Sequence, residues 1–257
     1  MSCATDPIFW QRQRRLPLPV MRFLRSLLDE ALGDPAQRSL LVWPTILGAP
    51  RLRETHPEGI PEEELLAQSR RMLEAFGILD PLEAWQESLL RFPHIAQQGP
   101  GGWLPGPLWE ALAPELSLRS GVILVARTGQ PEDDRYRLSC AVALFNMALF
   151  HECHDALEAL WLGSSGGLKE GLQGLILMSA GFYHQQHHDA AGMLALWRDG
   201  LPMLGRFGER LETPWGTVDF RESLATASGR LDWLMAEDDE ADLDRLWEMP
   251  RPEWSLT

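Results

Sequence analysis

Two stretches near the middle of the chain combine histidines, carboxylates and an amide at helical spacing. The first is Phe145–Trp161, with the sequence FNMALFHECHDALEALW, and the second is Lys169–His188, with the sequence KEGLQGLILMSAGFYHQQHH. Residues three, four and seven apart share one face of a helix, so each stretch should present a row of polar groups. The short loop Gly163–Gly167 separates them, which predicts an antiparallel helical hairpin.

The first predicted helix carries His154, Glu158 and Trp161 in one row beside an apolar arc. At 100° per residue, Glu152 and Asp155 point largely away from that arc, which makes His154 the polar group expected inside. The arc itself consists of Phe150, Cys153, Leu157 and Leu160.

The second predicted helix carries Lys169, Gln173 and His184 in one row. Its small residues Ala180 and Gly181 leave room for a close neighbour or a small ligand. If the two rows face each other, four polar side chains converge: His154, Glu158, Gln173 and His184. Three more would support this candidate ligand site: Asn146, Trp161 and Lys169.

Imidazole and carboxylate groups are the ligands expected of zinc or iron, and helical bundles build metal sites from facing side chains. The first hypothesis is a small-molecule or divalent-metal site with His154, Glu158 and His184 as metal ligands. In a catalytic version His154 would be ligand or general base, Glu158 its partner and Gln173 an orienting amide. A structural network explains the same residues, because buried polar groups must be paired. The second hypothesis is therefore a non-enzymatic scaffold or a dimerisation module.

Sharper chemical motifs do not follow from these residues. The sequence HECHD places its second histidine at i+3, whereas a zinc protease requires the i+4 spacing of HExxH. The pairs His151/His154 and His184/His187 have chelating spacing but lack the repeated ExxH pattern of di-iron bundles. Cys153 precedes His154 and points about 100° away from it on a helix, which favours a buried, inert thiol. Neither a GxxxxGK[ST] nor a GxGxxG motif supports nucleotide chemistry.

Polar and aromatic positions from about Ala141 to Leu204 follow a recurring order and spacing. They are Phe145, Asn146, Glu152, His154, Asp155, Glu158, Trp161, Gln173, Gly174, Leu175, Ile176, Tyr183, His184, Asp189 and Gly192. On these residues the chain resembles a bacterial and archaeal family, the domain of unknown function number 309. It departs from that family's pattern at Ala148 (usually Gly), Cys153 (a small residue), Asp155 (Glu), Leu177 (Gln), Met193 (Ala) and Gly200 (Ala). The resemblance implies an all-α bundle and carries no established activity.

Composition restricts the partners. The net charge of −14 argues against a nucleic-acid partner, because phosphate binding draws on clustered Lys and Arg. The absence of an 18-residue apolar run and of a secretory signal predicts no membrane span and a cytoplasmic location. The expected partner is a small molecule or a second copy of the chain. Trp247 and Trp254, in or beside a proline-containing tail, are candidates for docking onto this chain or another one.

The 257 residues, 45% of them hydrophobic, can form one large domain or a domain with an extension. We expect an all-α fold with a helical N-terminal region of unknown role (1–130), a bundle core (131–210) and C-terminal helices with an acidic tail (211–257). Helices are predicted at Leu18–Leu32, Pro61–Phe76, Asp80–Arg91, Leu108–Leu112, Tyr136–Leu162, Leu168–His187, from Asp189, Asp219–Met235 and Ala241–Trp247. Leu40–Ile60 and Gln97–Gly102 should be irregular. Gly121–Ala126 fits a short strand or a buried helix.

Overall fold

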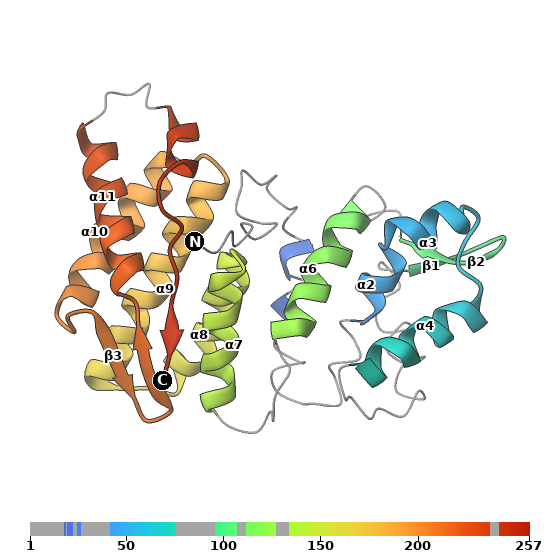
Figure 1. Cartoon of the computed structure of the whole chain (residues 1–257), viewed down its shortest axis with the longest axis horizontal. Helices are drawn as coiled ribbons and strands as arrows, with labels where there is room; N and C mark the ends of the chain where they lie inside the picture. The colour runs from blue at the N-terminus through green and yellow to red at the C-terminus, as the bar shows by residue number, and fades with distance from the viewer. Residues whose placement is uncertain are drawn as a thin grey trace, which may run out of the picture. The chain divides into compact units, whose positions relative to one another are not determined.

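The chain folds as two compact units, each of them mostly helical (Figure 1). One unit comprises Pro17–Pro131, and the other comprises Met1–Leu16 with Glu132–Thr257. The computed structural model describes residues 18, 20–22, 25–26, 42–75, 96–106, 112–126, 134–236 and 242–257. The predicted helical character is confirmed, with a few short antiparallel strands that the sequence did not indicate.

The first unit contains short helices and one β-hairpin. Its elements are α2 (Val42–Leu47), α3 (Pro50–Thr55), α4 (Glu62–Ala75), β1 (Ala96–Gly99), β2 (Gly102–Pro105) and α6 (Ala113–Ala126). The helix predicted from Pro61 is confirmed as α4, whose first turn carries three glutamates that complement the helix dipole. Gly121–Ala126 belongs to a helix, α6. The prediction for Leu40–Ile60 was wrong, because two helices form there, with Pro44 inside α2 and Pro50 at the start of α3.

The predicted loop Gln97–Gly102 is instead part of the β1–β2 hairpin. Gly102 has a φ of +141° and lies so close to the backbone of Ile60 that a Cβ would be 2.1 Å from the Ile60 carbonyl oxygen. Gly102 therefore allows the hairpin to approach Ile60, which pairs with Trp103 of β2. The predicted helix Leu18–Leu32 is helical at its described positions. Asp80–Arg91, most of Leu108–Leu112 and the acidic run at 237–240 lie outside the described residues.

The second unit is a helical bundle with a small sheet. Its elements are α7 (Asp134–Asn146), α8 (Phe150–Leu162), α9 (Gly166–Gln186), α10 (Ala190–Gly205), β3 (Arg210–Thr213), β4 (Gly216–Asp219), α11 (Arg221–Ala236), the 3₁₀ helix η3 (Leu243–Trp247) and β5 (Ser255–Leu256). Helix α9 packs against both α8 and α10, and α8 also packs against α7. The predicted hairpin is therefore present as α8 and α9. None of the helices in the described part of the chain is long and apolar enough to cross a bilayer.

The single helix predicted over Tyr136–Leu162 is in fact two helices, α7 and α8. The chain turns at Ala148, which has a φ of +57°, and the N–H of Leu149 donates to the carbonyl of Leu144. This is the left-handed conformation that commonly ends helices. The rings of Phe145 and Phe150 then meet edge to face across the break, at 5.1 Å between ring centroids.

Helices α9 and α10 approach closely because glycines line their contact. A Cβ on Gly181 would lie 2.0 Å from Nε1 of Trp197, so the space left by this glycine is filled by the indole. That indole N–H donates to the carbonyl of Met178 at 3.2 Å. Of the two possibilities expected at Gly181, a close neighbour or a small ligand, the structure shows the close neighbour. Asp189 caps α10 as predicted, accepting the N–H of Gly192.

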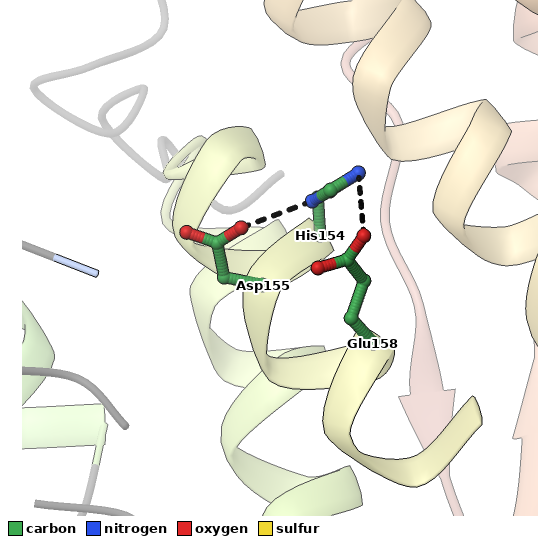
Figure 2. A group of neighbouring side chains, drawn as sticks. All are labelled: His154, Asp155 and Glu158. Carbon is green, nitrogen blue, oxygen red and sulfur yellow. Dashed lines mark hydrogen bonds and ion pairs between the residues drawn. The ribbon is translucent and has the colours of Figure 1, made fainter. Parts of the chain in front are cut away.

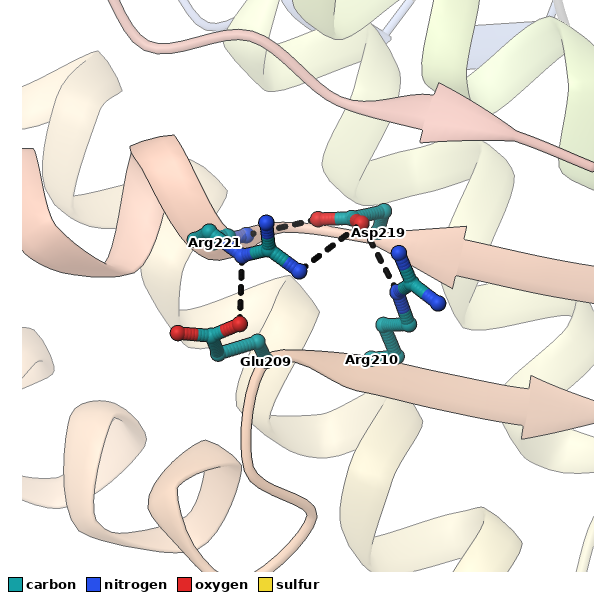
Figure 3. A network of polar contacts seen from close by, with 4 residues as sticks. All are labelled: Glu209, Arg210, Asp219 and Arg221. Atoms are coloured by element: carbon teal, nitrogen blue, oxygen red, sulfur yellow. Dashed lines mark hydrogen bonds and ion pairs between the residues drawn. The ribbon is translucent and has the colours of Figure 1, made fainter.

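Strands β3, β4 and β5 form one antiparallel sheet beside α11. Four charged side chains brace the start of α11, as Figure 3 shows: Glu209, Arg210, Asp219 and Arg221. The backbone N–H of Arg221 and the guanidinium of Arg210 hold the pKa of Asp219 below its usual range. The helix predicted from Asp219 is confirmed with a start two residues later.

Candidate metal centre

A buried carboxylate on α8, that of Asp155, lies between two imidazoles. Its Oδ2 is 3.2 Å from Nδ1 of His151 and its Oδ1 is 3.1 Å from Nδ1 of His154. A carboxylate only accepts hydrogen bonds, so both Nδ1 atoms must carry the protons. A neutral imidazole that carries its proton on Nδ1 presents an unprotonated Nε2, which is the form that binds metals.

Burial and hydrogen bonding act in opposite directions on this group. Burial alone would raise the pKa of Asp155, but the hydrogen bonds from His151 and His154 outweigh it and lower the pKa to about 2. Burial would likewise lower the pKa of His151, yet the hydrogen bond and charge of Asp155, with the charge of Glu152, raise it. The pair is thus stabilised in its charged form.

The predicted orientation of α8 was wrong for its carboxylates. Glu152 and Asp155 are only 4% and 2% exposed, whereas the His154 side chain, expected inside, is 26% exposed. The reason is that α8 is covered by both α7 and α9, so its buried arc is wider than a single helix contact requires. The predicted inert thiol is confirmed, because Cys153 is fully buried and burial raises its pKa.

His154 presents its second ring nitrogen to Glu158, one turn further along α8. Nε2 of His154 lies 3.9 Å from Oε1 of Glu158, and Figure 2 shows the two carboxylates on opposite sides of the imidazole. A metal usually lies about 2.0–2.2 Å from each nitrogen or oxygen ligand, so an ion fits between these atoms after a small adjustment. The Glu158 side chain is 31% exposed.

His154 lies between Asp155 at Nδ1 and Glu158 at Nε2, an arrangement that resembles the surroundings of metal-binding histidines in proteins. A ligating imidazole generally donates its other N–H to a carboxylate, which fixes the ring and raises its basicity. Among the described residues, these three form a group whose potential ligand atoms all lie within 4.8 Å of one another. Asp155 was not predicted as part of the site, although its i,i+4 spacing from His151 was visible in the sequence.

His184, the third metal ligand predicted from the sequence, is held elsewhere. Its Nδ1 lies 2.9 Å from Oδ2 of Asp189, the residue that caps α10. The ligand group on α8 therefore contains His154 and Glu158 but not His184. Gln173 is half-buried on α9.

The supporting residues predicted for the site have contacts of other kinds. Asn146 makes two hydrogen bonds with the backbone of Trp254. The Nζ of Lys169, the only lysine of the chain, lies 4.1 Å from the ring centroid of Trp161. This cation–π contact joins α8 to α9 beside the turn of the hairpin.

A tyrosine that was not among the predicted site residues, Tyr183, connects α8 and α9 near the candidate site. The ring of Tyr183 meets the rings of His151, His184 and His187 edge-on, at 5.2, 5.7 and 4.4 Å between centroids. Three imidazoles therefore surround one phenol at the end of α9. Their spacing along α9 and α8 was visible in the sequence, but their meeting required the pairing of the helices.

The loop between α8 and α9 has the sequence GSSGG and so fits the GxSxG pattern of many hydrolases. That pattern marks a nucleophile when it joins a strand to a helix. Here it joins two helices, and the serine at the nucleophile position, Ser165, is the N-cap residue of α9. The loop is therefore a helix connection and not a nucleophile elbow.

Comparison with known families supports the resemblance seen in the sequence. Residues 138–196 match the model of the family described as Domain of unknown function (DUF309). The chain thus carries a domain of this family, which includes α8, α9 and the ligand group. Comparisons with curated proteins and with solved structures gave no match.

Proposed function

We propose that this domain binds a divalent metal ion on α8, through Nε2 of His154 and the carboxylate of Glu158. The observation that carries the proposal is the placement of Asp155, which accepts the Nδ1 proton of His154 and leaves Nε2 facing Glu158. This protonation state is the one a metal requires of an imidazole ligand.

The ligand types favour zinc or iron over magnesium or calcium. One imidazole nitrogen and one carboxylate oxygen suit zinc, iron and other transition metals, whereas magnesium and calcium prefer oxygen ligands alone. Both side chains are partly exposed, so water or a small molecule would complete the coordination sphere. The same position would therefore serve as a small-ligand site, and an ion with an open coordination position is also what hydrolytic catalysis needs.

The test is metal binding by the untagged protein. After removal of metals by a chelator, Zn²⁺ is titrated by calorimetry, and the bound metal is counted by elemental mass spectrometry. We expect one zinc per chain for the wild type and none for His154→Ala. His184→Ala is the matched control and should bind like the wild type, because His184 does not belong to the ligand group on α8. Equal zinc binding by wild type and His154→Ala would contradict the proposal.

A structural role is the second candidate, and the burial of Asp155 favours it. A carboxylate that is 2% exposed and shared by two histidines ties neighbouring turns of α8 together without any ligand. The double variant His154→Leu/Glu158→Leu separates the two ideas. A scaffold should stay folded and associate as before, since apolar replacements of polar pairs are often neutral or stabilising. A binding domain should stay folded and lose zinc.

A further inference from the structure

The last nine residues of the chain, 249–257, cross the second unit as an extended segment that ends in β5 (Figure 1). We call them the C-terminal segment. Three hydrogen bonds from α11 go to their backbone. One guanidinium nitrogen of the buried Arg230 donates to the carbonyls of Met249 and Pro250, and the hydroxyl of the buried Ser223 donates to that of Glu253. These three hydrogen bonds go to backbone carbonyls and therefore do not depend on which side chains the segment carries.

One side chain of the segment, that of Trp254, is an anchor. Its ring stacks on Phe145 at 3.8 Å between centroids and 7° between planes, and the residue is only 3% exposed. The amide of Asn146 donates to the Trp254 carbonyl and accepts from the Trp254 N–H, both at 2.8 Å. The side-chain amide of Asn146 thus satisfies the backbone N–H and carbonyl of Trp254, as the backbone of a paired strand would.

The end of the segment is added to a preformed hairpin. Ser255 and Leu256 pair with Asp219 and Val218 of β4, and Thr257 exchanges two backbone hydrogen bonds with Thr217. The charged network around Asp219 and Arg221 holds the hairpin to α11 independently of the segment (Figure 3). The edge of β4 that pairs with β5 is therefore held by ion pairs in which the C-terminal segment takes no part.

A cavity of about 260 Å³ remains beside Trp254, lined also by Asp219, Arg221, Glu222, Glu253 and Ser255. Phe145 and Asn146 lie within the family match at 138–196, whereas the segment lies outside it. The two residues that hold Trp254 are thus inside the matched region, whereas β4 and α11, which hold the rest of the segment, lie outside it.

We propose that this face of the second unit, formed by the end of α7, the start of α11 and β4, is a binding site for an extended peptide anchored by tryptophan. Backbone pairing along a sheet edge combined with one side-chain pocket is a recurring mode of peptide recognition. In the structure the chain's own C-terminal segment occupies the site. The partner that fits this site is the C-terminal segment of a second copy of the chain, because that segment presents the same backbone and the same indole.

The experiment begins with the folded, full-length chain. A protease site is inserted in the acidic run at 237–240, and the chain is cut after folding, so that residues 242–257 are held only by non-covalent contacts. Native mass spectrometry then shows whether the piece stays bound. A fluorescent peptide of residues 242–257 is added, and its exchange into the cut protein is followed by anisotropy.

We expect the cut wild type to retain its piece at micromolar concentration and to exchange it for the labelled peptide. A labelled peptide with Trp254→Ala should bind at least tenfold more weakly. Cut Asn146→Ala should lose affinity by a similar factor, with Gly229→Ala on the exposed side of α11 as an unaffected control. Release of the piece from the cut wild type, or equal binding of both peptides, would overturn the proposal.

A second measurement uses the uncut chain and covers the case in which cutting unfolds it. In the wild type the attached segment competes at high effective concentration and should exclude the labelled peptide. An uncut Trp254→Ala chain, verified as folded by circular dichroism, should bind the wild-type peptide at least tenfold more tightly than the wild-type chain does. Equal, weak binding by the two chains would contradict a site that another copy can occupy.

Discussion

Asn146 at the end of α7 and Trp254 in the C-terminal segment are 108 residues apart in sequence and exchange two hydrogen bonds of 2.8 Å. The relationship fixes the C-terminal segment to the end of the helix that precedes the candidate metal centre. It also confirms that a tryptophan of the proline-containing tail docks onto this chain. The residue predicted as support for a ligand site therefore has a structural partner.

Asn146→Ala should destabilise the second unit by about 2 kcal/mol, because two hydrogen bonds are lost and the buried backbone groups of Trp254 are left unpaired. Urea unfolding followed by tryptophan fluorescence measures this loss. Thr213→Ala, on the β3–β4 turn, is a useful comparison, since it removes a side-chain hydrogen bond to Gly216 away from the segment. A midpoint for Asn146→Ala no lower than that of the wild type would show that the pair contributes nothing.

Gly181→Ala and Gly229→Ala should have opposite effects on stability. A Cβ at Gly181 would lie 2.0 Å from Nε1 of Trp197, so α9 and α10 must separate, at a cost of about 3 kcal/mol. A Cβ at Gly229, in the middle of α11, meets nothing within 4 Å, and the gain in helix propensity should stabilise by about 0.5–1 kcal/mol. Thermal unfolding of the two variants beside the wild type checks both signs.

Stability of the metal-free protein should fall when the solution is acidified. The pKa of Asp155 is about 2 in the folded chain, below its ordinary value of 3.8, so the unfolded chain binds more protons between these values. The contribution, on the order of 2 kcal/mol, is present above about pH 4 and is lost as the pH falls toward 2. Urea unfolding at a series of pH values, with Asp155→Asn as the variant lacking this dependence, measures it.

The raised pKa of His151 affects the stability of the folded chain near neutral pH. Its stabilisation is fully present below the ordinary histidine value of 6.5 and is lost as the pH rises through the folded value. The wild type should therefore be most stable between about pH 4 and 6.5 as far as this pair is concerned. A stability that is flat from pH 4 to 8 in the wild type would contradict the contact between His151 and Asp155.

Asp155→Asn should weaken zinc binding by about 10- to 100-fold without abolishing it, as is usual when the carboxylate behind a ligating histidine is removed. Glu158→Gln, which removes a direct ligand, should weaken zinc binding more. Calorimetric titration of both variants gives the ratio. If Asp155→Asn bound zinc as tightly as the wild type, the imidazole would not depend on this carboxylate for its orientation.

Local spacing determined several features of this protein. The i,i+4 relation of His154 and Glu158 brings them together on any α-helix, and the short glycine-containing loop makes α8 and α9 neighbours. The cap at Asp189 also follows from a local signal, because an N-cap side chain bonds to the first turn of its own helix. These features depend on residues close in sequence, which is why they could be predicted.

Tertiary structure decided which side of α8 is buried and which residues His184 and Asn146 contact. Asp155 is inside because α7 and α9 cover α8 from two directions, a fact that the period of one helix does not contain. His184 turns to Asp189 because the next helix begins there, and Asn146 meets Trp254 only once the C-terminal segment has docked. A sequence period defines faces of a helix, whereas the neighbouring elements determine which faces are covered and by what.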